Sequence, residues 1–246
     1  MALAITLLTT TINTGNNTTI TSASISPTAN ALIVVVPSFN DSAGNNFASI
    51  ADTFTGTGSW TKNADGFFDN YDGGNNDAGI AVYTAQAGSS PGSGTITVTH
   101  DAASARKLLH IYEVTGFNTT PVGVTGSNTG TGSTTLTVTA SGSPASDSLM
   151  VGGVFSLEPA VPAGDLGVDG AYTEGAETQT TGGANLLMLS VYDNGGPDSD
   201  VQFSNIVTTG DDAAGGVLVE IKIAAAGGGF QVAWARGSNA LIGVGQ

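Results

Sequence analysis

Residues 95–99 have the sequence TITVT, and residues 135–139 have the nearly identical sequence TLTVT. In both segments an apolar residue alternates with threonine, so an extended chain has one apolar face and one polar face. This alternation is typical of an antiparallel strand that rests one face on a core and turns the other to water. The two segments therefore predict an all-β, antiparallel protein.

Short β-branched segments, separated by clusters of Gly, Asn, Asp and Ser, extend this pattern along the chain. Residues 32–36 (LIVVV) are apolar throughout, so we expect that strand to be covered on both faces, at least partly. No window has a sustained 3.6-residue apolar period, and one short helix is an open alternative only at residues 101–106. We expect strands near residues 4–12, 18–25, 31–38, 78–84, 94–100, 107–115, 122–126, 133–140, 148–156, 186–192, 200–207 and 217–224.

A weak internal repeat relates the two halves of the chain. Residues 23–34 (ASISPTANALIV) parallel residues 140–151 (ASGSPASDSLMV). In each, a strand ends at a Ser-Pro turn, because proline fixes φ and cannot donate to a ladder, and a second strand follows. Two further pairs of segments match in the same order, namely AVY at 81–83 with SVY at 190–192, and HIYEV at 110–114 with LVEI at 218–221.

The repeat predicts pseudo-equivalent halves near residues 18–116 and 133–224. They form either two small domains or one sandwich with pseudo-twofold topology. We favour the single sandwich because no segment between the halves is long enough to look like a hinge. The predicted fold is a jelly-roll-like antiparallel β-sandwich over residues 1–224, since a jelly roll is built from two interlocked halves.

Composition excludes several classes of function. The chain has five Lys and Arg residues against twenty Asp and Glu residues, for a net charge of −15, and it has no cysteine. The five basic residues are scattered, whereas nucleic acids and anionic membranes both require clustered positive charge. We therefore expect neither a nucleic-acid nor a membrane partner, and no thiolate chemistry or disulfide.

Residues 225–246 differ from the rest of the chain. The Gly-rich run at 224–229 (AAAGGG) is typical of a flexible spacer. The residues after it are largely apolar and would be costly to leave in water. Either this arm folds back on its own sandwich, or it docks on a neighbouring subunit by strand addition or exchange, which the spacer favours. The expected assembly residues are Phe230, Val232, Trp234, Leu241 and Ile242.

Residues 63–77 form the richest polar segment, with Asp69, Asp72 and Asp77 as candidate ligands of calcium. Oxygen ligands on a Gly-bearing loop suit this ion. The spacing departs from an EF-hand because Phe68 stands at the first ligand position and the last Glu is missing. The alternative is a solvated loop with Asx turns, and we expect no other cofactor.

Aromatic residues gather in the same region of the chain. Trp60, Phe67 and Tyr71 are candidates for stacking on a sugar. Aromatic side chains in sandwich loops also plug the open end of the sandwich, and that alternative is the more common one.

The sequence assigns no catalytic residue. His100 and His110 lie in predicted strands with no third metal ligand at a useful spacing, and no Gly-x-Ser-x-Gly elbow is present. Glu113 and Glu220 take equivalent positions in the two halves, which favours a role in the fold over the acid–base pair of a glycosidase. We expect a protein that is not an enzyme.

Residues 24–32 (SISPTANAL) and the closing run 216–222 (GVLVEIK) resemble jelly-roll-like structural proteins from the virions of tailed bacteriophages. The similarity covers most of residues 18–224 and lies at the level of the fold. It implies a capsid decoration protein, a head fibre or a tail-associated subunit, and it carries no catalytic residues over to this chain.

The expected function is therefore that of a non-enzymatic virion protein, most simply a capsid decoration or head-fibre subunit. It would form a homo-oligomer, such as a trimer, and bind other virion proteins such as the major capsid protein. Residues 1–8 lack the regions of a signal peptide, which fits assembly in the host cytoplasm and a final place on the virion surface. The alternatives are a carbohydrate-binding, receptor-recognising module of a tail or fibre, and a subunit of a bacterial surface filament.

Overall fold

The structure of the chain, a computed structural model, describes residues 3–40, 46–68, 77–157, 166–180, 186–194, 196–206 and 213–224. These residues form antiparallel strands and contain no helix, so the predicted fold class is confirmed. A helix at residues 101–106 is wrong, because two paired strands meet there. The strands are β1 (Ala4–Asn13), β2 (Asn17–Thr21), β3 (Leu32–Asn40), β4 (Phe47–Asp52), β5 (Thr61–Phe68), β6 (Ala78–Gln86), β7 (Ile96–Ser104), β8 (Arg106–Thr115), β9 (Phe117–Thr131), β10 (Thr135–Thr139), β11 (Leu149–Ser156), β12 (Gly167–Val168), β13 (Thr173–Gln179), β14 (Leu187–Asn194), β15 (Asp200–Ser204) and β16 (Ala213–Ile223).

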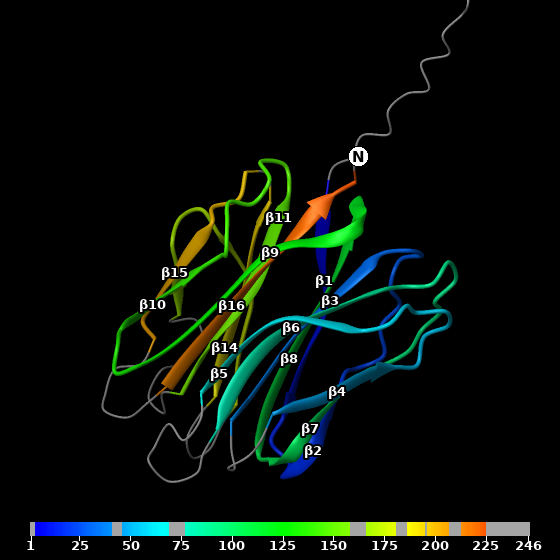
Figure 1. The fold of residues 1–246 in the computed structure, drawn as a ribbon. Helices are drawn as coiled ribbons and strands as arrows, with labels where there is room; N and C mark the ends of the chain where they lie inside the picture. Colours follow the sequence, from blue (N-terminus) through cyan, green and yellow to red (C-terminus); the bar gives the residue numbers. More distant parts are fainter. Residues whose placement is uncertain are drawn as a thin grey trace, which may run out of the picture.

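Four sheets are stacked in layers (Figure 1). The first outer sheet has the order β2-β7-β4, and the first central sheet has the order β1-β8-β3-β6-β5. The second central sheet (β13-β14-β11-β16-β9) packs on the first, and the second outer sheet (β10-β15-β12) covers its far side. Three apolar clusters fill the spaces between successive layers.

The central strands are buried on both faces. All nine residues of β3 and all eight residues of β11 are buried. Val34 faces the other central sheet, while Ile33 and Val35 face the first outer sheet. A strand that is apolar on both faces needs another layer on each face, and this is why the stack has four layers. The sequence had led us to expect the two layers of one sandwich.

The two halves of the chain are built alike. Each strand of the first half corresponds to the strand eight places later in the chain. The first central sheet, β1-β8-β3-β6-β5, thus corresponds to β9-β16-β11-β14-β13, and the first outer sheet, β2-β7-β4, corresponds to β10-β15-β12. The Ser-Pro turns also correspond, since Ala31 N donates to Thr28 O at 3.1 Å and Ser148 N donates to Ala145 O at 3.0 Å. Each half thus supplies eight strands in two sheets, the strand count of a jelly roll, and jelly-roll connectivity stays our interpretation of each half.

Candidate functional site

Glu113 on β8 and Glu220 on β16 hold the two Ser-Pro turns. The Glu113 carboxylate accepts hydrogen bonds from Thr28 N at 2.7 Å and from Thr28 Oγ1 at 3.0 Å. The Glu220 carboxylate accepts from Ala145 N at 2.8 Å and from Val124 N at 2.9 Å. Thr28 and Ala145 each follow the proline of their turn, so the repeated glutamates serve the fold at equivalent places.

Glu220 is only 4% exposed. Burial alone would raise the pKa of its carboxyl group, but the hydrogen bonds from Ala145, Val124 and Ser148, together with the positive charge of Lys222, outweigh burial, and the pKa is lowered. A carboxylate held in its charged form in this way is a poor general acid near neutral pH.

We expect Glu220→Gln to be the costlier of two matched substitutions. The glutamine amide would face a backbone N–H that needs an acceptor, and this partly buried donor would lose its partner at a cost of about 2 kcal/mol. Glu113→Gln should cost less than about 1 kcal/mol, because water reaches its exposed hydrogen bonds. Urea unfolding of both variants measures the difference, and equal losses would contradict the greater burial of the Glu220 hydrogen bonds.

A buried polar cluster joins the two central sheets. His110 on β8 places Nδ1 2.8 Å from Ser190 Oγ on β14, and Nε2 2.8 Å from Thr178 Oγ1 on β13. The Tyr112 hydroxyl also hydrogen-bonds Ser190, which donates to the Ala176 carbonyl at 3.2 Å. Each central sheet contributes polar groups to this cluster, so it fixes how one sheet lies on the other.

The cluster contains a serine next to an imidazole, which is the pair that nucleophilic catalysis requires. Burial lowers the pKa of His110 to about 3, so its imidazole is neutral at pH 7. Both His110 and Ser190 are 0% exposed, however, and a substrate could not reach the hydroxyl without separating the sheets. The geometry assigns this cluster to the packing of the two halves.

His100 lies in a different environment, within the first half. Its ring contacts Phe39 and Phe47, with centroids 5.0 Å and 5.3 Å away. Neither ring nitrogen has a hydrogen-bond partner in the described part of the chain. Burial, with a smaller contribution from the positive charge of Lys107, lowers the pKa of His100 to about 4.

Lys107 is a buried cation that the sequence analysis assigned no role. Its side chain is 0% exposed, and Nζ donates to the carbonyl oxygens of Gly15 and Asn17 at 3.0 Å each and to that of Ser104. Carbonyl oxygens from two separate segments thus converge on one ammonium group. This arrangement ties the β1–β2 connection to the start of β8, which is a structural role.

The predicted calcium ligands are only partly within the described residues. Asp69 and Asp72 lie outside them, and Asp77 is buried just before β6. Among the described residues, no group of three His, Cys, Asp or Glu side chains is placed to hold a metal ion. The calcium site therefore stays a prediction.

The candidate sugar-stacking residues are also divided. Trp60 and Phe67 are half-buried and pack on the cluster between the first two sheets. The Trp60 indole donates to Asp52 Oδ2 at 2.8 Å, which fixes the ring against the end of β4. Tyr71 lies outside the described residues, and a sugar-binding role stays a prediction.

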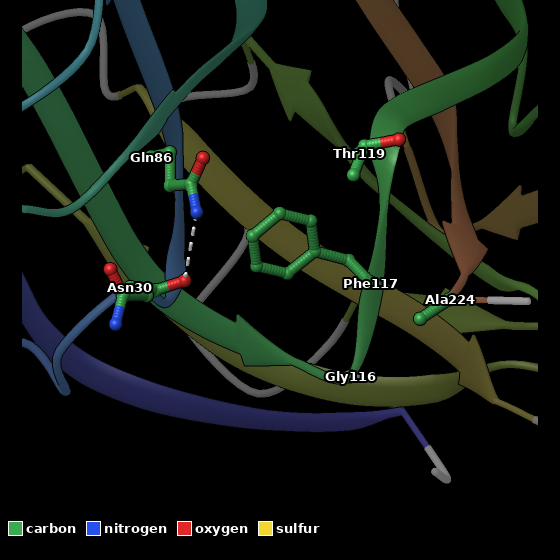
Figure 2. A pocket seen from close by; sticks show the side chains of 6 residues that line it. All are labelled: Asn30, Gln86, Gly116, Phe117, Thr119 and Ala224. Atoms are coloured by element: carbon green, nitrogen blue, oxygen red, sulfur yellow. Dashed lines mark hydrogen bonds between the residues drawn. The ribbon is translucent and has the colours of Figure 1, made fainter. Parts of the chain in front are cut away.

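A pocket of about 330 Å³ lies where the chain crosses from the first half to the second (Figure 2). The Phe117 ring occupies its middle in the view, and Gln86 Nε2 donates to the Asn30 carbonyl at 3.4 Å on the opposite side. None of its lining side chains carries a charge or a strong nucleophile. The lining residues are Asn30, Gln86, Gly116, Phe117, Thr119 and Ala224.

Ala224 at this pocket is the last described residue. Its N–H donates to the Gly116 carbonyl at 2.8 Å, which fixes the end of the described chain beside the crossing between the two halves. The predicted assembly residues Phe230, Val232, Trp234, Leu241 and Ile242 lie outside the described residues.

The comparisons with known proteins returned no relative. No protein-family model matches the chain, and neither a curated protein nor a solved structure matches it. Across the described segments, no helix has the length and apolar character needed to cross a membrane.

Proposed function

We propose that the protein is a non-catalytic structural subunit of a bacteriophage virion, a capsid decoration protein or a head-fibre subunit, that assembles through residues 225–246 and its free sheet edges. One observation carries the proposal. The last strand, β16, ends one residue before Ala224, and the sequence continues from there into a Gly-rich spacer and a largely apolar segment.

The described interior supports a structural rather than a chemical role. The groups best suited to catalysis, His110 with Ser190 and the carboxylate of Glu220, are hydrogen-bonded within the fold and buried. The acidic composition of the chain suits an outer surface that stays soluble and does not associate nonspecifically with other molecules. On a particle, many weak contacts of an arm and a sheet edge add up through repetition.

The first test is the mass in solution of the full chain and of a version that ends at Ala226, by light scattering. The full chain should be a trimer or larger, and the shortened chain a folded monomer, because only the full chain carries the apolar arm. Circular dichroism confirms that both are folded. Folded monomers in both cases would count against assembly through the arm.

The second test concerns the virion itself. Phage particles purified by density gradient from the culture or community that carries the gene are digested and analysed by mass spectrometry. Peptides of this chain should band with the intact particles. Peptides found only in fractions free of particles would refute a place on the virion.

A further inference from the structure

The edge strand β1 is built to accept another strand. Among the described strands it pairs only with β8, and it lies at the end of the first central sheet. None of its ten residues is charged, and it carries the exposed large apolar side chains Leu7 (40% exposed) and Ile12 (48% exposed). A long, uncharged edge strand with apolar side chains in water is a template for strand addition, which natural proteins usually prevent.

The other edges of the central sheets are protected. β5 carries the Lys62–Asp65 ion pair, with Nζ and Oδ2 2.5 Å apart, and it packs on β9 and β16. A Cβ added at Gly66 on β5 would lie 3.0 Å from the Gly216 carbonyl, so this corner of the stack is closed by backbone contact. The corner formed by β5 and β9 corresponds, in the duplicated architecture, to the corner formed by β13 and β1.

The remaining two edges differ from β1 in sequence. β13 carries Glu174 and Glu177, and charges on an edge strand discourage pairing. β9 contains Pro121, which cannot donate to a new ladder, and its pairing with β16 has two irregularities. Among the four edges of the central sheets, β1 is therefore the one suited to receive a strand.

We propose that β1 receives residues 230–235 (FQVAWA) from a neighbouring copy of the chain, added antiparallel along its free edge. This inference rests on the proposed function, since it names the place where the assembly arm binds. The alternating Phe230, Val232 and Trp234 would supply one apolar face to cover Leu7 and Ile12. Residues 225–246 carry a single charge, from Arg236, so they can approach a chain of net charge −15 without repulsion.

Chain geometry excludes the same copy as the source of an antiparallel strand. Ala4 at the start of β1 is paired with Thr115, next to Gly116, whose carbonyl accepts from Ala224. The arm therefore leaves beside the start of β1 and, in its own copy, could run along β1 only in the same direction. Antiparallel pairing would require the chain from Ala224 to Phe230, which reaches about 21 Å, to cover the distance of about 26 Å from Ala4 to Ile12.

Every strand pair in the described sheets is antiparallel, and purely antiparallel sheets are favoured over mixed ones. A neighbouring copy can present its arm from the far end of β1 and satisfy this preference. Each copy then gives an arm and receives one, and this head-to-tail contact closes into a ring or extends as a filament.

Cysteine cross-linking tests the proposal, because the full chain has no cysteine of its own. Full-length proteins with one substitution each are mixed in pairs and oxidised, with a size tag on one of them. β1 has a bulge between Leu7 and Thr9, so Thr6 and Thr11 share one face while Leu7 and Ile12 share the other. We expect Gln231→Cys to link to Thr11→Cys, and Ala235→Cys to link to Thr6→Cys, as antiparallel pairing requires. Thr61→Cys on the exposed start of β5 is the matched control and should not link to either arm position.

The reverse pairs, Gln231→Cys with Thr6→Cys and Ala235→Cys with Thr11→Cys, test the alternative of a parallel strand from the same copy. Each reverse pair is built into one chain. A disulfide that closes within that chain, with no link between chains, would overturn the proposal. Equal linking of the arm to Thr61→Cys would overturn it too, because the contact would not be specific for β1.

A second measurement separates this inference from the proposed function. The full chain with Leu7→Lys and Ile12→Lys should self-associate about tenfold more weakly or worse, because assembly would bury two lysines against an apolar strand. Unchanged assembly in this variant, together with monomers on removal of residues 227–246, would overturn binding at β1 but leave an assembly arm. A wild-type chain that stays monomeric would refute both.

Discussion

Acidification from pH 7 to pH 5 should lower the free energy of unfolding by about 4 kcal/mol. His110 and His100 are both buried, with pKa values lowered to about 3 and about 4 from an ordinary value of 6.5. Both imidazoles are neutral in the folded protein, whereas in the unfolded chain they take up protons below pH 6.5. Their contribution to stability is therefore complete above pH 6.5 and is lost as the pH falls towards 4 and 3.

Each histidine should contribute a slope of about 1.4 kcal/mol per pH unit within this range. Urea unfolding at a series of pH values measures the slope. His100→Phe is the most informative variant, because the described structure gives the His100 nitrogens no hydrogen bond to lose and surrounds the ring with Phe39 and Phe47. This variant should keep its stability at pH 7 and show about half the slope between pH 6 and pH 5. A free energy of unfolding that does not change from pH 7 to pH 5 would contradict the burial of both imidazoles.

Gly152→Ala should prevent folding or cost at least about 3 kcal/mol. Gly152 lies in β11, at the centre of the second central sheet. An added Cβ would come within 1.9 Å of the Val217 carbonyl oxygen and within 3.0 Å of Leu218 Cα on β16. Both atoms belong to a backbone that is held by ladder hydrogen bonds, so no side-chain rotation can relieve the clash.

Gly130→Ala is the matched control in the same sheet. Gly130 lies on the edge strand β9, and an added Cβ would meet only the Leu136 Cδ1 atom at 3.6 Å, an ordinary contact. Its melting temperature should stay within a few degrees of wild type, while the Gly152→Ala protein should be insoluble or melt at least about 10 °C lower. Similar behaviour of the two variants would show that the close approach at Gly152 is relieved at little cost.

Sequence patterns predicted the strands in the middle of the sheets and missed strands at their edges. The four strands absent from the prediction, β4, β5, β12 and β13, each end a sheet. β5 (TKNADGFF) and β13 (TEGAETQ) are polar and charged because an edge strand is less covered, and a charge there also discourages aggregation. A search for apolar alternation cannot find strands of this kind.

The internal repeat also contains a signal of the buried polar cluster. When Glu113 is aligned with Glu220, His110 stands opposite Val217 and Tyr112 opposite Val219. A polar side chain in one half that stands where the other half has an apolar one indicates a buried polar contact. His110 and Tyr112 are such side chains, and both belong to the buried cluster. Their partners Ser190 and Thr178 come from the other half. These partners could not be predicted, because the sequence does not say which strands face each other between the two central sheets.

The single crossing between the halves sets an order of events during synthesis. All strands of the first two sheets precede Gly116, and all strands of the other two follow it. The ribosome therefore completes the first half while its partner does not yet exist, and the apolar side of β3, β6 and β8 that the second half will cover faces water. Until β13 and β14 emerge, His110 also lacks both of its hydrogen-bond partners. The nascent protein thus passes through a stage in which this apolar surface is exposed to water. The rate of translation of residues 117–224 determines how long the exposure lasts.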